Sequence, residues 1–240
     1  GYNALTAATD GNSNVCIGRN AGQSITGAGG AVAIGYAALA TEDASGTSVA
    51  VGYTALEDQN VNSNANVAVG YKAGTNLTTG TNSVFLGYQS GGVAVVTGSY
   101  NIGLGADSAK NLTSGQYNVA IGSSALSVAA TNSDNTAIGH NALANVTAED
   151  NVAIGSRAMK YSTSAADNVA VGRNALQGDG STAPTGNCNV AIGSYSLDAS
   201  TTGHSNIAVG YQSGTAITTG NSTVAIGYQS LAANQTGANN

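Results

Sequence analysis

Residues 118–122 read Asn-Val-Ala-Ile-Gly, and this five-residue pattern decides the fold because variants of it occur thirteen times at nearly constant spacing. Only the interval between Gly172 and Gly193 is clearly longer than the others. A fixed period of this size indicates a repeat protein in which each unit packs on its neighbours. The closing glycines are Gly18, Gly35, Gly52, Gly70, Gly87, Gly105, Gly122, Gly139, Gly155, Gly172, Gly193, Gly210 and Gly227.

Large and small apolar residues alternate before each glycine, which is numbered here as position zero. Position −1 is always Ile, Val or Leu, position −3 is Val or Ile in all units but one, and position −2 is Ala in ten. A period of two is typical of a short β-strand. We expect the large residues at −3 and −1 to be buried and Ala to form a second face that another chain can approach closely. The glycine itself indicates a tight bend or a close backbone contact.

A second apolar position follows the glycine. Position +3 is Ala or Ser in all fourteen units, counting the partial unit that starts at Gly1, and position +4 is Leu or Met in nine. The other five units have Gly or Ala at +4 and place an apolar residue three or four positions later. We therefore predict one buried anchor per turn, supplied by either of two loop conformations. The five replacement anchors are Ile25, Leu77, Val95, Leu112 and Ile217.

Asparagine occupies position −4 in nine of the thirteen units. At a corner, Asn tolerates unusual backbone angles and bonds to its own main chain. In a stack of similar turns the side-chain amides can also form a ladder. Position −4 is therefore expected to be a corner of each turn.

A unit of about 17 residues is too short for a strand followed by a crossover helix. The sequence therefore predicts an all-β solenoid with about 17 residues per turn and about 14 turns. It spans residues 1–240 as a single repeat domain with a long loop at 178–186, and both ends fall within a repeat, as in a piece of a longer fibre. Periodicity leaves two assemblies open: a parallel homotrimer, whose chains meet at the Ala face, and a single-chain solenoid.

Composition excludes several classes of function. The net charge is −6 and only 8% of residues are charged, which argues against binding nucleic acid through a basic patch. No apolar run approaches the roughly 18 to 20 residues that a membrane-spanning helix needs. Two cysteines, Cys16 and Cys188, lie about ten turns apart, too far for a disulfide bond.

Residues that could carry catalysis are few. Only two histidines occur, and His140 stands at position +1, where other units have Tyr, Arg or Ser, so we interpret it as a solvated variant. Neither a phosphate-binding loop nor a metalloprotease motif is present. Three acidic pairs are interpreted as solvated loop residues that add solubility, because the calcium-binding nonapeptide is absent. We predict no enzymatic activity, catalytic residue, metal ion or cofactor. The acidic pairs are Glu42-Asp43, Glu57-Asp58 and Glu149-Asp150.

Position +1 supplies the candidate binding site, because tyrosine recurs there. Turns stacked at a rise of about 4.8 Å would place these rings in one aromatic column. Such a column either contacts sugars or protein surfaces, or packs against its own neighbours and across a trimer interface with the hydroxyls at the edge. Both alternatives stay open. The candidate residues are Tyr36, Tyr53, Tyr71, Tyr88, Tyr211 and Tyr228.

The repeats resemble two known groups of proteins. Residues 118–122, 151–155 and 48–52 are similar to the core motif in the head repeats of YadA-like trimeric autotransporter adhesins. Residues 223–231, Thr-Val-Ala-Ile-Gly-Tyr-Gln-Ser-Leu, resemble repeats of bacteriophage tail fibres, of the type found upstream of endosialidase-type chaperone domains. The resemblance covers nearly the whole chain.

This resemblance implies a left-handed parallel β-roll assembled as a homotrimer. It also implies an extracellular location on a virion tail or a bacterial surface, with attachment to a host cell-surface glycan or protein. The repeat unit here is longer than that of the adhesin heads, and the Tyr-Gln-Ser-Leu continuation favours the tail-fibre type.

Two other functions compete with attachment. An ice-binding solenoid would use a flat threonine array, but the pairs Thr78-Thr79 and Thr218-Thr219 have counterparts in only a minority of turns. A polysaccharide depolymerase would need two carboxylates about 5 to 10 Å apart. The pattern shows no acidic pair pointing inward.

Overall fold

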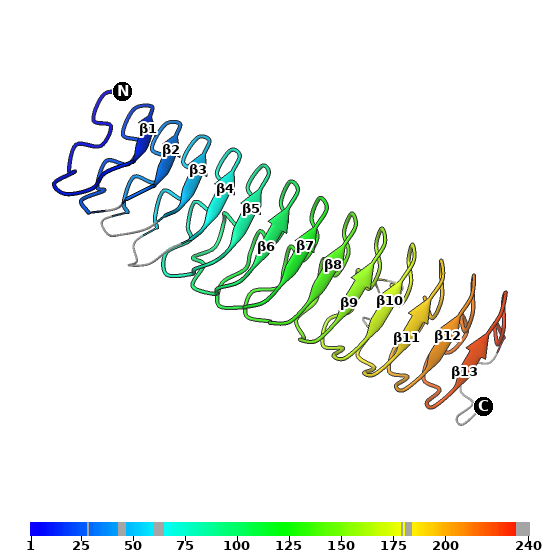
Figure 1. The fold of residues 1–240 in the computed structure, drawn as a ribbon. Coiled ribbons are helices and arrows are strands. Elements are labelled where there is room, and N and C mark those ends of the chain that lie inside the picture. The colour runs from blue at the N-terminus through cyan, green and yellow to red at the C-terminus, as the bar shows by residue number, and fades with distance from the viewer. Residues whose placement is uncertain (28, 43–46, 60–64, 179, 181–183, 234–240) are drawn as a thin grey trace. The chain divides into compact units, whose positions relative to one another are not determined.

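The computed structural model describes the chain except for residues 28, 43–46, 60–64, 179, 181–183 and 234–240 (Figure 1). Two compact units are present, an N-terminal unit, Gly1–Tyr117, and a C-terminal unit, Asn118–Asn240. Asp43 of the first acidic pair and four residues of the predicted long loop at 178–186 lie outside the described residues.

Every strand is three residues long and coincides with positions −3 to −1 of a repeat. In the N-terminal unit these are β1 (Val15–Ile17), β2 (Val32–Ile34), β3 (Val49–Val51), β4 (Val67–Val69), β5 (Val84–Leu86) and β6 (Ile102–Leu104). In the C-terminal unit they are β7 (Val119–Ile121), β8 (Thr136–Ile138), β9 (Val152–Ile154), β10 (Val169–Val171), β11 (Val190–Ile192), β12 (Ile207–Val209) and β13 (Val224–Ile226).

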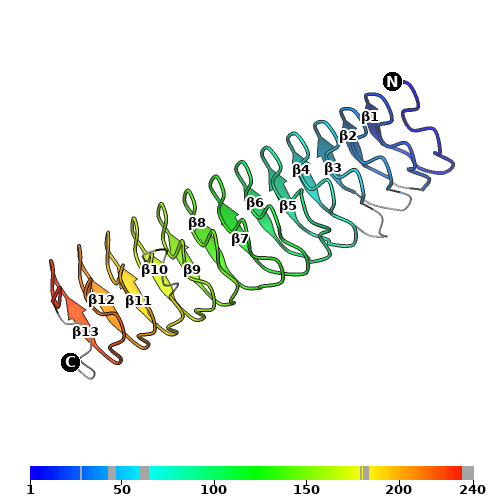
Figure 2. The same ribbon diagram turned by 180° about the vertical axis from the view of Figure 1, so that it is seen from behind.

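Within each unit, consecutive strands pair in parallel and in register. Val15 lies opposite Val32, and Val152 lies opposite Val169, so one turn of the coil corresponds to one sequence repeat at both places. The turn from Val169 to its partner Val190 contains more residues than the others, because the long loop lies in it. Figures 1 and 2 show each strand running into a narrow loop before the chain returns to start the next turn.

The predicted all-β solenoid is confirmed. Each turn takes about 17 residues, as the sequence period requires, and equivalent residues of neighbouring turns lie side by side. No helix occurs among the described residues.

The two faces of the strands are the reverse of the prediction. Ala120 and Ala153, at position −2, are fully buried, whereas Ile154 and Ile192, at position −1, are 38% and 40% exposed. The reason is the narrow interior of so short a turn. A Cβ added at Gly214, a +4 position, would lie 3.4 Å from the Cβ of Ala208, a −2 residue. Since the large +4 side chain already fills this space, only a small residue fits on the inner face of the strand.

The predicted anchors are buried in both loop conformations, except that Leu5 and Leu231, in the first and last units, are only half-buried and that one replacement anchor is misplaced. Leu143 at +4 is fully buried, and so are the replacement anchors Ile25, Leu77 and Leu112, with Ile217 at 1% exposed. The prediction that Val95 is the anchor of its turn is wrong, because Val95 is 58% exposed while Val96 is fully buried. Val96 forms a parallel bridge with Leu77, although it lies further from its own repeat glycine than Leu77 does. The longer loop thus moves the anchor along the chain.

Phe85 replaces Ala at position −2 and is fully buried. A Cβ at Gly91, the +4 residue of the same turn, would lie 2.4 Å from the Phe85 ring. A Cβ at Gly103, the −2 residue of the next turn, would lie 2.9 Å from it. Three exceptions to the repeat pattern therefore form one compensating set, in which two missing side chains make room for a large one.

The repeat glycines form a column in which the backbones of successive turns nearly touch. Gly155 has a φ of +132°, and a Cβ on it would lie 2.5 Å from the carbonyl oxygen of Gly172. The predicted close backbone contact is confirmed. Both the backbone angle and the lack of space require glycine at this position.

The predicted asparagine ladder is also confirmed. The Oδ1 atom of Asn135 accepts a hydrogen bond from the backbone N–H of Asn151 at 3.1 Å, and Asn151 Oδ1 accepts one from Asn168 at 3.1 Å. All three side chains are fully buried. The unusual backbone angle lies one residue earlier, at position −5, where Asp150 has a φ of +59°. Asn at −4 therefore links successive turns through its Oδ1 atom, and it also bonds to its own main chain as predicted, since Asn151 Nδ2 donates to the carbonyl of Glu149 at 2.9 Å.

Replacing Asn151 with alanine should lower the free energy of unfolding by about 1–3 kcal/mol, because the buried N–H of Asn168 loses its acceptor. Urea titration followed by circular dichroism measures this loss. Asn145→Ala is the matched control, since its side chain is only half-buried. Equal losses in the two variants would mean that the ladder adds no stability of its own.

Candidate functional site

The predicted aromatic column is present in the N-terminal unit. Tyr36, Tyr53, Tyr71 and Tyr88 stack one above the other, with ring centroids 5.1, 5.3 and 5.2 Å apart and planes within 13° of parallel. Their side chains are 41 to 52% exposed. Arg19 continues the column, because its guanidinium lies 5.9 Å from the Tyr36 ring centroid. We call these four rings the tyrosine column.

Stacking decides which parts of the rings a ligand can reach. Tyr53 and Tyr71 have a neighbouring ring on each face, so their accessible surface consists of ring edges and hydroxyls. Sugars commonly pack on an open aromatic face, which these two rings do not offer. The rings do pack against their neighbours, as one of the two sequence alternatives required, and their edges still face solvent.

The other predicted tyrosines lie in the C-terminal unit. Tyr211 and Tyr228 stack with centroids 5.7 Å apart, and Tyr195 meets Tyr211 edge to face at 6.4 Å. Arg173 donates a hydrogen bond to the hydroxyl of Tyr195 and lies over its ring. Between β7 and β11, position +1 carries Ser, His or Arg instead, so this unit has only a short aromatic group at its C-terminal end.

A further tyrosine pair escaped sequence reasoning. Tyr100 and Tyr117 stack with centroids 5.0 Å apart and planes 5° from parallel, and they are 49% and 55% exposed. Both stand at position −5 of consecutive repeats. Comparing that position between units would have found them, as it found the residues at +1.

The outward side of the strands is an exposed apolar surface, which we call the aliphatic face. It consists of the residues at positions −3 and −1 of the strands. In the N-terminal unit, Val15, Ile17, Val69, Leu86 and Ile102 are between 36 and 58% exposed. In the C-terminal unit, Ile154, Ile192, Ile207, Val224 and Ile226 are between 38 and 68% exposed. Contiguous exposed apolar surface of this kind is typical of protein interfaces.

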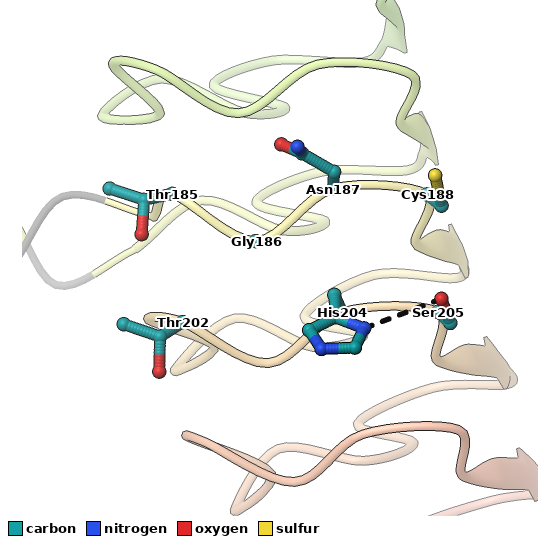
Figure 3. A pocket seen from close by; sticks show the side chains of 7 residues that line it. All are labelled: Thr185, Gly186, Asn187, Cys188, Thr202, His204 and Ser205. Carbon is teal, nitrogen blue, oxygen red and sulfur yellow. Dashed lines mark hydrogen bonds between the residues drawn. The ribbon is translucent and has the colours of Figure 1, made fainter.

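Of the two cysteines and two histidines, Cys188 and His204 line the same pocket. Cys16 and Cys188 are both free, and burial raises the pKa of the Cys16 thiol. His140 is exposed, as predicted. Figure 3 shows Cys188 and His204 on successive turns, with the sulfur directed away from the imidazole. They border a pocket of about 290 Å³ lined by Thr185, Gly186, Asn187, Cys188, Thr202, His204 and Ser205.

The acidic residues only partly match the prediction of solvated loops. Glu42 is fully buried and accepts a hydrogen bond from Gln59 Nε2, which also contacts Ser48 Oγ at 2.8 Å. The loop thus turns this carboxyl inward, onto polar partners from the next turn. Burial raises the pKa of the Glu57 carboxyl, and the neighbouring Asp58 adds to that effect. Among the described residues, no group of three His, Cys, Asp or Glu side chains could hold a metal ion.

Threonine hydroxyls in the loops are engaged with the backbone. Thr147 Oγ1 donates to the carbonyl of Thr163 at 2.9 Å, and Thr201 Oγ1 donates to that of Thr218 at 3.1 Å. Thr78 Oγ1 makes a similar bond to Val96 at 3.3 Å. These hydroxyls therefore tie each turn to the next.

No protein-family model matches the chain, and no curated protein matches it significantly in sequence. Within the described residues there is no helix long and apolar enough to cross a membrane.

Proposed function

We propose that this chain is a structural and adhesive segment of an extracellular homotrimeric fibre, without enzymatic activity, that attaches a phage tail or a bacterial surface to a host cell. The observation that carries the proposal is the aliphatic face, which repeats in turn after turn on the outward side of the strands. In this proposal the coil is left-handed and runs for about 14 turns.

The spacing of the aliphatic face favours a second copy of the same chain as its partner. Its residues recur once per turn, at the separation of neighbouring parallel strands. A surface that matches this spacing over many turns must have the same repeat, and another copy in parallel orientation provides it. Three copies around one axis give a closed assembly in which each aliphatic face is covered. The chains thus meet through Val and Ile rather than through the buried Ala.

The double variant Ile154→Lys/Ile192→Lys should dissociate the trimer, because each exposed isoleucine becomes a charge that the interface would have to bury. We expect a shift from about three chains towards one, measured by sedimentation at micromolar concentration. Ser156→Lys/Ser194→Lys adds the same charges at position +1 of the same turns and serves as the control. Dissociation of the control alone would place the interface elsewhere.

Attachment is tested separately from assembly. Fluorescently labelled protein should bind saturably to whole cells from a panel of bacterial strains and animal cells. Binding that is lost after periodate oxidation would identify a glycan receptor, and binding that is lost after surface proteolysis would identify a protein. Absence of saturable binding to every cell type would contradict the adhesive role and leave only a structural one.

A further inference from the structure

We propose that the stacked tyrosines are sites of oxidative cross-linking, at which a one-electron oxidant of the peroxidase type joins successive turns through dityrosine. The sites are the neighbouring pairs of the tyrosine column and the pair Tyr100 and Tyr117. This inference does not depend on the adhesive role or on the trimer.

The geometry holds two phenol rings close together. Tyr71 and Tyr88 have centroids 5.2 Å apart and planes 8° from parallel, and Tyr100 and Tyr117 are closer still at 5.0 Å and 5°. Because the two members of each pair occupy the same repeat position on successive turns, their rings are held side by side and nearly parallel. Two reacting groups held in this way couple far faster than two that must first meet by diffusion.

The reaction balances with hydrogen peroxide as the terminal oxidant. Each of two phenols gives up one electron and one proton, and together these reduce one peroxide molecule to two water molecules. The two phenoxyl radicals then form a carbon–carbon bond between the Cε atoms beside their hydroxyls. The ring hydrogen at each end of the new bond shifts to the phenolic oxygen, which restores both hydroxyls.

Exposure lets the oxidant reach the rings in the folded protein. The rings of these pairs are between 41 and 55% exposed, so no unfolding is required for electron transfer. Tyr161 provides an internal contrast. Its ring lies under the Lys160 ammonium at 4.7 Å, and none of the ring pairs found among the described residues includes it.

Trypsin distinguishes two of the four predicted links, because Tyr36, Tyr53 and Tyr71 all lie in peptide 20–72 and links among them stay within that peptide. It cleaves after Arg19, Lys72, Lys110 and Arg157, so a link between Tyr71 and Tyr88 joins peptide 20–72 to peptide 73–110. A link between Tyr100 and Tyr117 joins peptide 73–110 to peptide 111–157. Mass spectrometry distinguishes the two products.

The experiment treats dilute native protein with peroxidase and hydrogen peroxide, then measures dityrosine fluorescence and the linked peptides. We expect these two products in chains that keep the mass of one chain on a denaturing gel. Their yield should fall about tenfold when the chain is unfolded in urea before oxidation. Tyr88→Phe should remove the first product and leave the second, and Tyr161→Phe should change neither.

Three results would overturn the proposal. One is oxidation of the tyrosines without dityrosine, and another is equal yield from the native and the urea-unfolded chain. The third is a set of linked peptides in which Tyr161 occurs as often as the stacked rings.

Discussion

Replacing Gly155 with alanine is expected to lower the free energy of unfolding by more than about 4 kcal/mol. The φ of +132° is strained for any residue with a Cβ, and that Cβ would lie 2.5 Å from the carbonyl oxygen of Gly172. The contact is with backbone, so no side-chain rotation can relieve it. Relief requires that two turns separate, which breaks the strand pairing between Val152 and Val169. Circular dichroism during urea titration measures the loss.

Gly27→Ala is the matched control for this variant. A Cβ on Gly27 would have no atom within 4 Å, and its φ lies outside the left-handed region. Its free energy of unfolding should stay within about 0.5 kcal/mol of the parent value. If both variants lose the same stability, close approach of the glycine backbones does not hold the turns together.

Replacing Phe85 with alanine should cost about 3–5 kcal/mol, because it removes the largest fully buried side chain and leaves a cavity. Two of the walls of that cavity are Gly91 and Gly103, which have no side chain to move into it. Urea titration of the variant measures this cost.

Gly103→Ala tests whether these residues compensate one another. Alone it should also destabilise the protein, since the new Cβ lies 2.9 Å from the Phe85 ring. Combined with Phe85→Ala it recreates the Ala-on-Ala pairing seen between Ala153 and Ala170. The double variant should therefore lose about 1–3 kcal/mol less than the sum of the two single losses. Strict additivity would show that Phe85 and Gly103 do not compensate for each other.

The period of the sequence predicts the register of the sheet well. Each strand coincides with positions −3 to −1, and partners such as Val190 and Ile207 are one repeat apart. It does not predict which face of the strand is inside, because both faces are apolar and alternation alone does not tell them apart. The width of the interior decides, and only the structure shows that Leu143 and its equivalents leave space for alanine alone.

The candidate site likewise has features that the sequence predicts and features that it does not. Recurrence of tyrosine at one position predicts a column, because equivalent residues of a solenoid lie one above the other. It cannot predict that Tyr53 and Tyr71 cover each other's faces, because ring orientation depends on side-chain torsions. Burial of Glu42 was missed since its partner Gln59 lies in a loop whose length varies between repeats.

The mass of the protein in solution tests the central claim, that the aliphatic face is covered by copies of the same chain. One chain has a mass of 23.3 kDa, so static light scattering of the purified protein should give about 70 kDa, three times that value. A single species of 23.3 kDa at micromolar concentration would contradict the claim.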